Sequence, residues 1–543
     1  MIILISVFRR IYIITQENHG RVNKVQIRDT FGHLCERMLR TRLLQRCLSH
    51  HVPLSCRAMH LLRDNAYING NWIGASSKQT FPVCNPVDNT VIAHVPDMNV
   101  ADTQVAINAA VKAFETFSKT TAKERSDLLR KWYNLMVEHS EDLARILTKE
   151  NGKSLAESRA EIKYGNSFVE WFSEEARRIG GEVLQAPASN RELFLLRQPV
   201  GVAALITPWN FPHAMITRKA GAALAAGCTC VVKPSEDTPL TALALADLAE
   251  QAGFPSGILN VLTTSITNSA AVGKELCENP KIRVLSFTGS TAVGKILYKQ
   301  CASTVKRLGL ELGGNAPYIV FKSADVDLAV NSAMASKFRN TGQTCVSANR
   351  FFVEADIFDE FVKKFVARIE KDIKLGDGSK EGITHGPLIK KSQLDMVDGL
   401  VKDAVQKGAK VHCGGNPLPD LGPLFYAPTL LTNITEDMQI YNKEIFGPVA
   451  VINKFSSEED VLRQANDTPV GLAGYFFSQD ISQIFRVARK LEVGMVGANE
   501  GLISCAEAAF GGVKESGLGR EGSKHGVEDF LDIKYVCVGN LKY

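Results

Sequence analysis

The sequence lacks an apolar run long enough to cross a membrane. A spanning helix needs about 20 apolar residues, and the apolar stretches near the N-terminus, residues 1–8 and 11–14, are short and are separated by Arg9 and Arg10. A secretory signal also fits poorly, because its positive charges precede the apolar stretch and here they follow it. We therefore expect no association with a membrane.

Metal-binding and disulfide patterns are missing as well. The twelve cysteines are scattered, no Cys-x-x-Cys pair occurs, and no histidine stands at zinc-ligand spacing from any of them. In a chain of 543 residues this distribution is typical of reduced thiols in a compartment without oxidative folding. The sequence thus predicts neither a disulfide framework nor a metal site.

A nucleic-acid-binding surface is not expected either. The formal net charge is +5, but residues 1–64 contain 11 basic and 4 acidic residues. Residues 65–543 contain 52 basic and 54 acidic residues and are therefore close to neutral. A nucleic-acid-binding domain normally carries an excess of basic residues, and the body of the chain has no such excess.

The positive charge is concentrated in a leader at residues 1–60. Its basic residues are almost all arginine, and residues 38–48 (MLRTRLLQRCL) place three leucines on one helical face and two arginines away from it. This amphipathic, Arg-rich pattern is typical of a mitochondrial presequence, so we predict a protein of the mitochondrial matrix. Because the pattern begins at Met38, we expect translation to start there, which would leave residues 1–37 untranslated.

Hydrophobic patterning divides the rest of the chain into two lobes. The chain is too long for one core, and its 45% hydrophobic and 22% charged residues are typical of a globular protein. Residues 201–315 alternate continuous apolar strands with helices, which predicts a parallel sheet covered by helices on both faces. Residues 316–515 show a second pattern of this kind. We therefore predict an α/β fold with two Rossmann-like parallel lobes.

Local signals place several elements within this plan. An Asn-Gly pair predicts a hairpin at residues 67–73. Residues 100–176 are helical in pattern and contain no proline. A Thr-Pro pair at residues 238–239 and Gly253 mark the start and the end of a further helix.

Two strand-like segments have no neighbouring helix and strand to pair with. They lie at residues 192–202 and 532–538. Such strands often complete a sheet contributed by another subunit. The sequence therefore predicts a small β element that serves oligomerisation.

The segment VLSFTGSTAVGKIL, residues 284–297, combines a strand, a glycine-bounded turn and a helix start. Residues 289–295 match most of a P-loop, but Ile296 stands where that motif has Ser or Thr to hold magnesium. The segment also lacks the Gly-x-Gly-x-x-Gly spacing of the dinucleotide fingerprint. An NTPase thus remains an alternative with an incomplete metal site, and the helix N-terminus can approach a pyrophosphate.

One cysteine has unusual surroundings. Cys345 lies in NTGQTCVSANR, a polar segment of small residues, whereas an unpaired cysteine is most often a buried core residue. As a nucleophile it would need a lowered pKa or a base that takes its proton. The candidate bases are His213 and Glu311, which lies between two leucines. Glu311 is expected to be either ion-paired or desolvated with a raised pKa, and only the second state suits a general base.

Two further polar residues occupy positions suited to ligand binding. Asn210 lies between aromatic and proline residues in ITPWNFP, where its amide either caps the turn or donates to a developing oxyanion. Lys233 follows the strand CTCVV and thus lies at the carboxyl end of a parallel strand, where α/β proteins bind ligands. An exposed lysine at a strand end is the simpler alternative.

Six motifs together resemble the aldehyde dehydrogenase family, in order and at the expected spacing. They are PWNFP (208–212), KPSE (233–236), FTGS (287–290), LELGG (310–314), GQTC (342–345) and EIFGPV (444–449). The resemblance implies that Cys345 is the nucleophile, Glu311 the general base, and Asn210 the oxyanion donor together with the backbone N–H of Cys345. The implied reaction oxidises an aldehyde to an acid through a thioester.

The resemblance also implies a nicotinamide cofactor. Matched position by position, its binding residues are Trp209, Lys233, Pro234, Ser235, Glu236, Gly289, Ser290, Gly294, Glu444 and Phe446. Lys233 and Glu236 would bind the adenine ribose hydroxyls, and Glu444 the nicotinamide ribose. A carboxylate at Glu236 would repel a 2′-phosphate, so we expect NAD rather than NADP.

The family's organisation implies the functions of the parts. The expected parts are an NAD-binding domain at residues 64–180 and 200–313, a catalytic domain at 314–515, and oligomerisation strands at 181–199 and 526–540. The resemblance implies a homotetramer.

The substrate is expected to carry a carboxylate. Longer stretches, including residues 334–345 and 510–526, are similar to family members that oxidise succinate semialdehyde to succinate in 4-aminobutanoate degradation. They imply Arg218, Arg339 and Ser504 as substrate-binding residues. Guanidinium groups bind carboxylates bidentately, and Arg339 precedes the nucleophile by six residues, which suits a four-carbon chain.

Some alternatives stay open. The substrate could be another aldehyde, such as glutarate semialdehyde or a medium-chain aldehyde, and either arginine could form a helix-surface salt bridge. A family member recruited as a structural protein would be expected to lose Cys345 or Glu311, and both are present. Some members carry a second cysteine two residues after the nucleophile. This chain has Ser347 there, so we expect no disulfide between these positions.

Overall fold

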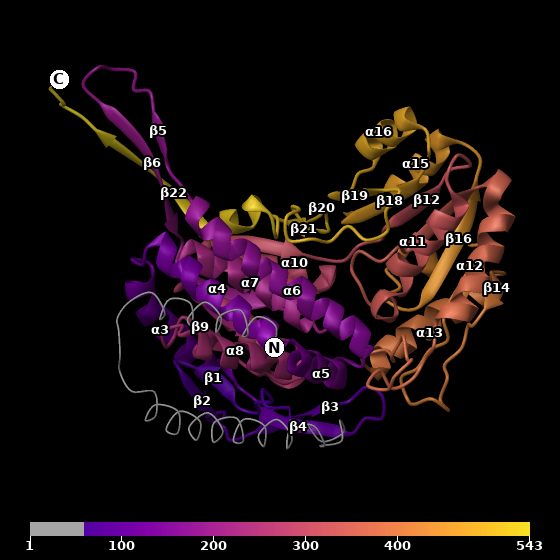
Figure 1. Cartoon of the computed structure of the whole chain (residues 1–543), viewed down its shortest axis with the longest axis horizontal. Helices are drawn as coiled ribbons and strands as arrows, with labels where there is room; N and C mark the ends of the chain where they lie inside the picture. Colours follow the sequence, from indigo (N-terminus) through magenta and orange to yellow (C-terminus); the bar gives the residue numbers. More distant parts are fainter. Residues whose placement is uncertain (1–58, 543) are drawn as a thin grey trace, which may run out of the picture. The chain divides into compact units, whose positions relative to one another are not determined.

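The computed structural model describes residues 59–542, and the predicted leader lies almost entirely outside them. The chain separates into a unit Met1–Met59 and a body His60–Tyr543, of which only the body is considered further. Its strands form two large sheets, one three-stranded sheet and two two-stranded ribbons (Figure 1). None of the helices in the described range is long and apolar enough to cross a membrane. The expected α/β class is confirmed.

The first large sheet contains eight strands. Their order across the sheet is β2 (Asn71–Ile73), β1 (Ala66–Ile68), β9 (Leu259–Val261), β8 (Thr229–Lys233), β7 (Val202–Ile206), β10 (Ile282–Thr288), β11 (Arg307–Glu311) and β21 (Gly517–Leu518). The five strands from β9 to β11 are parallel, and the three outer strands are antiparallel to their neighbours. β7 and β8 are buried along their whole length, as continuous apolar strands between helical layers should be.

Helices surround this sheet. They are α3 (Val100–Phe117), α4 (Ala122–Glu138), α5 (Ser140–Asn151), α6 (Leu155–Glu175), α7 (Pro212–Ala226), α8 (Pro239–Ala252), α9 (Ile266–Glu278) and α10 (Thr291–Cys301). The predicted hairpin is confirmed by β1 and β2, and the helical region by α3 to α6. α6 packs against α4, α5 and α7.

Sequence signals explain several helix ends. A capping box joins Ser154 and Glu157 at the start of α6, where each satisfies the other's backbone N–H. α8 starts at Pro239 and stops before Gly253, which adopts a left-handed φ of 90°, as predicted. The start of α8 has no cap of its own, and the buried carboxylate of Glu150 instead accepts the N–H groups of Leu240 and Thr241 at 2.7 and 2.8 Å.

The second large sheet contains seven strands. Their order is β14 (Lys410–Cys413), β15 (Thr429–Thr432), β16 (Val449–Phe455), β13 (Arg350–Glu354), β12 (Pro317–Val320), β18 (Ala473–Phe477) and β19 (Met495–Ala498). All neighbours are parallel except β14 and β15. The associated helices are α11 (Val326–Phe338), α12 (Phe358–Asp372), α13 (Lys391–Gln406), α14 (Gln439–Asn442), α15 (Glu458–Asn466) and α16 (Ile481–Lys490).

The remaining short elements connect these parts. The ribbons pair β3 (Thr80–Cys84) with β4 (Val91–Pro96) and β17 (Val470–Gly471) with β20 (Val513–Lys514). The 3-10 turns are η2 (Ala176–Arg178), η3 (Ala302–Thr304), η4 (Arg339–Gly342), η5 (Ala355–Ile357) and η6 (Lys524–Phe530).

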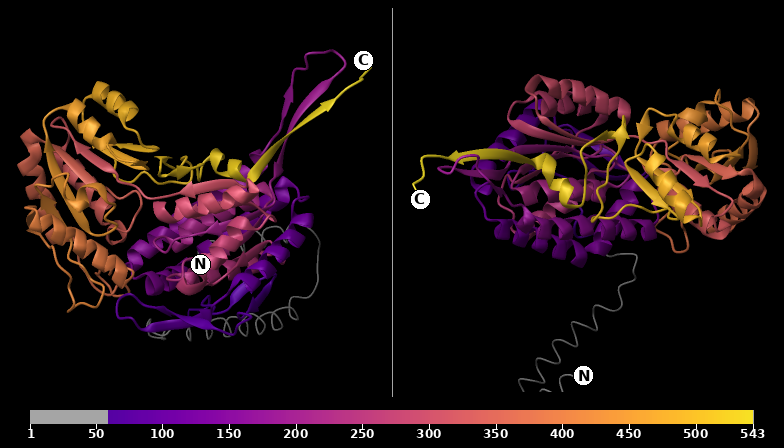
Figure 2. Two further views of the ribbon diagram at one scale, coloured as in Figure 1. Left: turned by 180° about the vertical axis from the view of Figure 1, so that it is seen from behind. Right: turned by 90° about the horizontal axis from the view of Figure 1, so that it is seen from above.

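The two strand-like segments predicted at residues 192–202 and 532–538 pair with each other. β6 (Glu192–Pro199) lies between β5 (Glu182–Leu184) and β22 (Leu531–Val538), antiparallel to both. Figures 1 and 2 show these three strands extending away from the helices of the first sheet, with the C-terminus at their tip. Several of their apolar side chains are exposed, including Val183 at 71% and Ile533 at 62%.

Candidate active site

The loop that carries Cys345 is held in a strained conformation. It follows η4, in which Asn340 and Thr341 have left-handed φ angles of 52° and 55°. Such angles cost about 1–3 kcal/mol each in a non-glycine residue. At Gly342 an added Cβ would lie 2.1 Å from the carbonyl oxygen of Gly447. The surroundings therefore fix this loop and require glycine there.

The Cys345 thiol is protonated in this structure near neutral pH. Burial raises its pKa to about 12, the nearby carboxylates of Glu444 and Glu311 also raise it, and Arg218 lowers it. The loop immediately after the thiol is fixed by Tyr475, whose phenol donates to the Val346 carbonyl at 2.7 Å. Because the surroundings do not lower the thiol pKa, Cys345 needs a base to become a nucleophile.

Glu311 has the properties of such a base. It is the last residue of β11, only 4% exposed, and neither of its carboxylate oxygens has a hydrogen-bond partner in the described part of the chain. Burial raises its pKa well above the usual value, and the charge of Glu521 adds to this effect. Of the two states left open by the sequence, the structure therefore favours the desolvated carboxylate over the ion pair.

Asn210 connects to the cysteine loop through its side chain. Its Nδ2 donates to the carbonyl oxygen of Gln343 at 3.1 Å, two residues before Cys345. Its Oδ1 is buried and accepts no hydrogen bond within residues 59–542. An amide nitrogen carries two N–H groups, so one of them holds the loop and the second remains for an oxyanion on the substrate.

Three of the residues expected to bind cofactor lie close to the candidate catalytic residues. The rings of Trp209 and Phe446 meet edge to face with centroids 5.5 Å apart. Glu444 accepts the Gly314 N–H at 3.3 Å, and burial raises its pKa to about 7. Aromatic surfaces and a carboxylate beside the thiol fit a nicotinamide ring and its ribose hydroxyls.

The start of α10 fits a pyrophosphate. Ser290 caps the helix, accepting the Val293 N–H at 3.4 Å, and Gly289 precedes it. At Gly294 an added Cβ would come within 2.4 Å of Leu312, so the glycine allows the helix to pack closely. Free N–H groups at a helix start bind phosphate.

The P-loop interpretation receives no support from the same segment. Lys295 is exposed and forms an ion pair with Glu515 at 2.7 Å. Ile296, at the position of the magnesium-binding hydroxyl, is 56% exposed. Among residues 59–542, no group of three or more His, Cys, Asp or Glu side chains is arranged to hold a metal ion.

The residues expected to bind the adenosine part of the cofactor lie at and just after the C-terminal end of β8. The ammonium of Lys233 is buried and donates to the Pro234 carbonyl at 3.2 Å. The Ser235 hydroxyl accepts the N–H of Asp237 at 3.3 Å, which shapes the turn. Glu236 lies 3.7 Å from the ammonium of Lys390. A lysine and a carboxylate at a strand end fit ribose hydroxyls.

Lys390 is a further charge at this end that sequence reasoning missed. It lies just before α13 and binds Asp237 at 2.6 Å as well as Glu236. Lys390 is more than 150 residues away from these carboxylates in the sequence, so no local sequence pattern indicates that they are paired.

The Arg218 guanidinium lies in an aromatic cage. It is only 1% exposed and stacks over the rings of Phe168 and Phe510 at 4.7 and 4.2 Å. It donates to the Tyr164 phenol at 2.6 Å and lies 3.3 Å from Glu521. The cage excludes a helix-surface salt bridge for Arg218, because the side chain points into the protein.

Tyr164 links the three residues expected to bind substrate. Its ring lies 5.7 Å from the Arg218 guanidinium and 5.8 Å from that of Arg339. Burial raises the pKa of the Tyr164 phenol. The charges of both arginines and a hydrogen bond to Ser504 oppose this rise without cancelling it. Arg339 also stacks over Phe211 at 4.8 Å. The structure thus gathers Arg218, Arg339 and Ser504 around a tyrosine that the sequence motifs did not reveal.

His213 is not suited to be the base. Its side chain is fully buried, and neither ring nitrogen has a hydrogen-bond partner among the described residues. Burial lowers its pKa to about 3. A neutral imidazole of such low basicity cannot deprotonate a thiol effectively near neutral pH, which leaves Glu311.

The site geometry and the matched sequence define a protein class. The protein-family sequence model described as "Aldehyde dehydrogenase family" matches residues 72–536 of this chain. The chain belongs to this family and is therefore an oxidoreductase. The family membership expected from the six motifs is confirmed.

Particular relatives are closely similar. Mitochondrial succinate-semialdehyde dehydrogenase of Homo sapiens is 55% identical over 481 residues, 89% of each chain. The NADP(+) succinate-semialdehyde dehydrogenase GabD of Escherichia coli (strain K12) is 50% identical over 480 residues, 88% of this chain and 98% of its own. A solved betaine aldehyde dehydrogenase of Staphylococcus aureus in complex with NAD+ is 36% identical, with a TM-score of 0.86, over 89% of this chain and 97% of its own.

Proposed function

We propose that the protein oxidises succinate semialdehyde to succinate with NAD as oxidant, in the mitochondrial matrix and as a step of 4-aminobutanoate degradation. The single observation that carries the substrate is the pair of guanidinium groups, Arg218 and Arg339, on either side of Tyr164. Relatives named for this substrate and for mitochondria support the proposal, as does the Arg-rich leader.

The first half of the proposed reaction takes place on Cys345. Glu311 accepts the thiol proton directly or through water, and the sulfur forms a bond to the aldehyde carbon while the carbonyl electron pair moves to oxygen. The second N–H of Asn210 and the backbone N–H of Cys345 donate to this oxyanion. A nicotinamide cofactor held by Trp209, Glu444 and Phe446 would supply the hydride acceptor for the same carbon, so that the product on Cys345 would be a thioester.

The second half is hydrolysis. Glu311 first releases the thiol proton to solvent and then takes a proton from water, the resulting hydroxide adds to the thioester carbon, and the carbon–sulfur bond breaks. Cys345 leaves as a thiolate and recovers a proton from Glu311, and the carboxylic acid departs. The raised pKa of Glu311 suits this step, because a more basic carboxylate removes a proton from water more readily.

The substrate carboxylate would bind between Arg218 and Arg339. Arg218 is preoriented by its aromatic cage and by Tyr164, which lowers the entropy lost on binding. Arg339 is partly exposed, and no carboxylate lies within ion-pair distance of it in the described chain. It is therefore free to pair with a substrate anion.

A panel of aldehydes tests this function. NADH or NADPH production is measured from succinate semialdehyde, glutarate semialdehyde, butanal and hexanal, with NAD and NADP in parallel. We expect the highest kcat/KM for succinate semialdehyde with NAD, at least about tenfold above butanal, because a lost charged hydrogen bond costs roughly 1.5–3 kcal/mol. A higher value for glutarate semialdehyde or hexanal would assign the enzyme to that aldehyde.

The cofactor preference rests on Glu236. Its carboxylate would repel the 2′-phosphate of NADP, and the ammonium of Lys390 is shared between Glu236 and Asp237. A cation held by two carboxylates offers little attraction to a phosphate. One relative is named for NADP(+) and one solved relative is in complex with NAD+, so the parallel measurement with NADP decides the point.

Arg339→Met tests carboxylate recognition. We expect KM for succinate semialdehyde to rise roughly 10- to 100-fold, with KM for butanal nearly unchanged, because butanal has the same length and no carboxylate. Arg463→Met is the matched control, since Arg463 is an exposed residue paired with Asp460. Equal losses for both aldehydes would show that Arg339 does not recognise the carboxylate.

We also infer a homotetramer from the exposed three-stranded sheet. Apolar side chains on β5, β6 and β22 face solvent, including Val183, Leu196, Ile533 and Tyr535. An exposed apolar strand edge favours pairing with another chain. The mass in solution, measured by light scattering, distinguishes four copies from two.

A further inference from the structure

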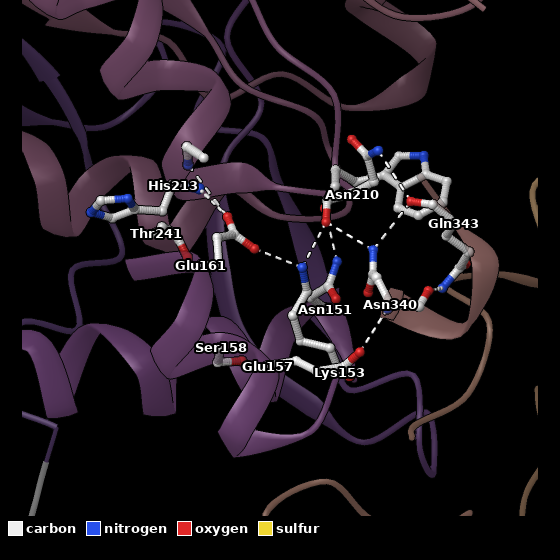
Figure 3. Close-up of polar contacts among 12 residues, drawn as sticks. Asn151, Lys153, Glu157, Ser158, Glu161, Asn210, His213, Thr241, Asn340 and Gln343 are labelled. Carbon is white, nitrogen blue, oxygen red and sulfur yellow. Dashed lines mark hydrogen bonds and ion pairs between the residues drawn. The ribbon is translucent and has the colours of Figure 1, made fainter. Parts of the chain in front are cut away.

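The loop between α5 and α6 is tied to the turn that carries Asn210. Lys153 belongs to this loop, and its side chain is only 1% exposed. Its ammonium donates to a carboxylate oxygen of Glu161 at 2.6 Å and to the backbone carbonyl of Asn210 at 2.7 Å (Figure 3). A charged donor thus holds the backbone of the residue whose side chain is proposed to bind the oxyanion.

The second oxygen of Glu161 holds the helix that follows. It accepts the N–H groups of His213 and Ala214 at 2.9 and 3.3 Å, in the first turn of α7. α7 has no side-chain cap of its own, and a carboxylate at a helix start is favourable. α6 and α7 are also closely packed, since an added Cβ on Gly165 would lie 2.0 Å from the His213 ring.

The same face of α6 holds the cysteine loop. Glu157 lies one turn before Glu161, and its carboxylate accepts the Asn340 N–H at 2.6 Å. The Asn340 side-chain amide in turn donates to the Asn210 carbonyl at 2.9 Å and to the Gln343 carbonyl at 3.2 Å. Residues four apart lie on one helical face, so α6 sets the relative positions of the two catalytic segments.

Global stability does not account for the ion pair. Removing two charges from water costs several kcal/mol, and buried pairs can often be replaced by uncharged side chains without loss of stability. The pair instead supplies hydrogen bonds to specific backbone groups, because Lys153 donates to the Asn210 carbonyl and Glu161 accepts two N–H groups of α7. Its effect is therefore geometric.

We propose that Lys153, held by Glu161, is a positioning residue that aims the free N–H of Asn210 at the oxygen of the aldehyde bound to Cys345. The Asn210 carbonyl is fixed by two donors and one of its amide hydrogens by Gln343. The direction of the remaining N–H is then set by α6. This inference rests on the role proposed above for Asn210.

A double-mutant cycle tests it. Lys153→Met and Glu161→Gln are combined, so that no buried charge is left unpaired, and the pair is introduced into the unmodified enzyme and into Asn210→Ala. The readout is the single-turnover rate of NADH formation at saturating succinate semialdehyde, together with NAD affinity. We expect a loss of roughly 30- to 100-fold in the unmodified background, less than about threefold in Asn210→Ala, and NAD affinity within about twofold.

Thr148→Val is the matched control. Thr148 lies on α5, and the substitution removes its buried 2.8 Å hydroxyl hydrogen bond to Ser158 on α6, which does not involve Asn210. We expect it to change the rate by less than about twofold in both backgrounds. If Lys153→Met/Glu161→Gln fails to fold, Lys153→Gln/Glu161→Gln is measured in the same two backgrounds, since two polar side chains then fill the site and no buried charge is left unpaired.

The outcomes separate the possible failures. Equal losses in both backgrounds, or a loss below about threefold in the unmodified enzyme, would overturn the positioning role. If Asn210→Ala alone costs less than about tenfold, the assignment of Asn210 and this inference both fail. If no aldehyde in the panel is oxidised by the unmodified enzyme, the proposed function fails first.

Discussion

Glu311→Gln should slow the first turnover, because Cys345 loses its base, and should give a slow burst of about one NADH per active site followed by a steady state roughly 10²- to 10⁴-fold slower than that of the unmodified enzyme. Glutamine has the same size but cannot take a proton from water, so the thioester on Cys345 accumulates. The unmodified rate should rise with pH through the raised pKa of Glu311, because only the carboxylate form acts as base. This rise should be absent from the variant.

Rapid-mixing measurement of NADH and mass spectrometry of the quenched protein together check this result. Glu515→Gln is the control, since Glu515 is an exposed glutamate paired with Lys295. A steady state close to that of the unmodified enzyme would exclude Glu311 as the hydrolytic base. Loss of the burst, with no acyl adduct, would place its main effect before hydride transfer, at deprotonation of Cys345.

Cys345→Ser should reduce turnover on the order of 10⁴-fold or more, with NAD affinity nearly unchanged. A hydroxyl is far less acidic than a thiol, and the surroundings of Cys345 already raise the thiol pKa to about 12. A site that disfavours the anion of a thiol disfavours an alkoxide even more. Fluorescence titration with NAD and steady-state NADH production provide the two measurements.

Cys505→Ser is the matched control, because Cys505 is an exposed free thiol. We expect its turnover to equal that of the unmodified enzyme. Residual activity of Cys345→Ser within about a hundredfold of the unmodified enzyme would show that the sulfur is not the nucleophile.

The parallel sheets were predictable because burial on both faces leaves continuous apolar strands in the sequence. β7 and β8 are examples, and the ends of α8 carried explicit proline and glycine signals. The pairing of β6 with β22 was not predicted. These strands lie far apart in the sequence, and they can pair only because the rest of the fold places them side by side.

The candidate catalytic residues were predicted from motifs, whereas the residues that contact them were not predicted. Tyr164, Lys153 and Glu161 lie on or next to α6, where polar residues are common on any helix. Lys153 and Glu161 pair with each other, but their other partners and that of Tyr164 are more than 50 residues away. Only the packing of α6 against α7 brings them together, and no local pattern encodes that packing.

The short strand β21 has a consequence for the order of synthesis. Gly517 pairs with Glu311, and the Ser516 carbonyl accepts the N–H of Leu312, so the last part of the chain borders the base. Domains form from the N-terminus as the chain emerges from the ribosome. A nascent chain that ends before residue 516 can contain all other strands of the two large sheets but has no neighbour along that edge of β11. The edge beside Glu311 is therefore completed only after all the other strands of both large sheets have been synthesised.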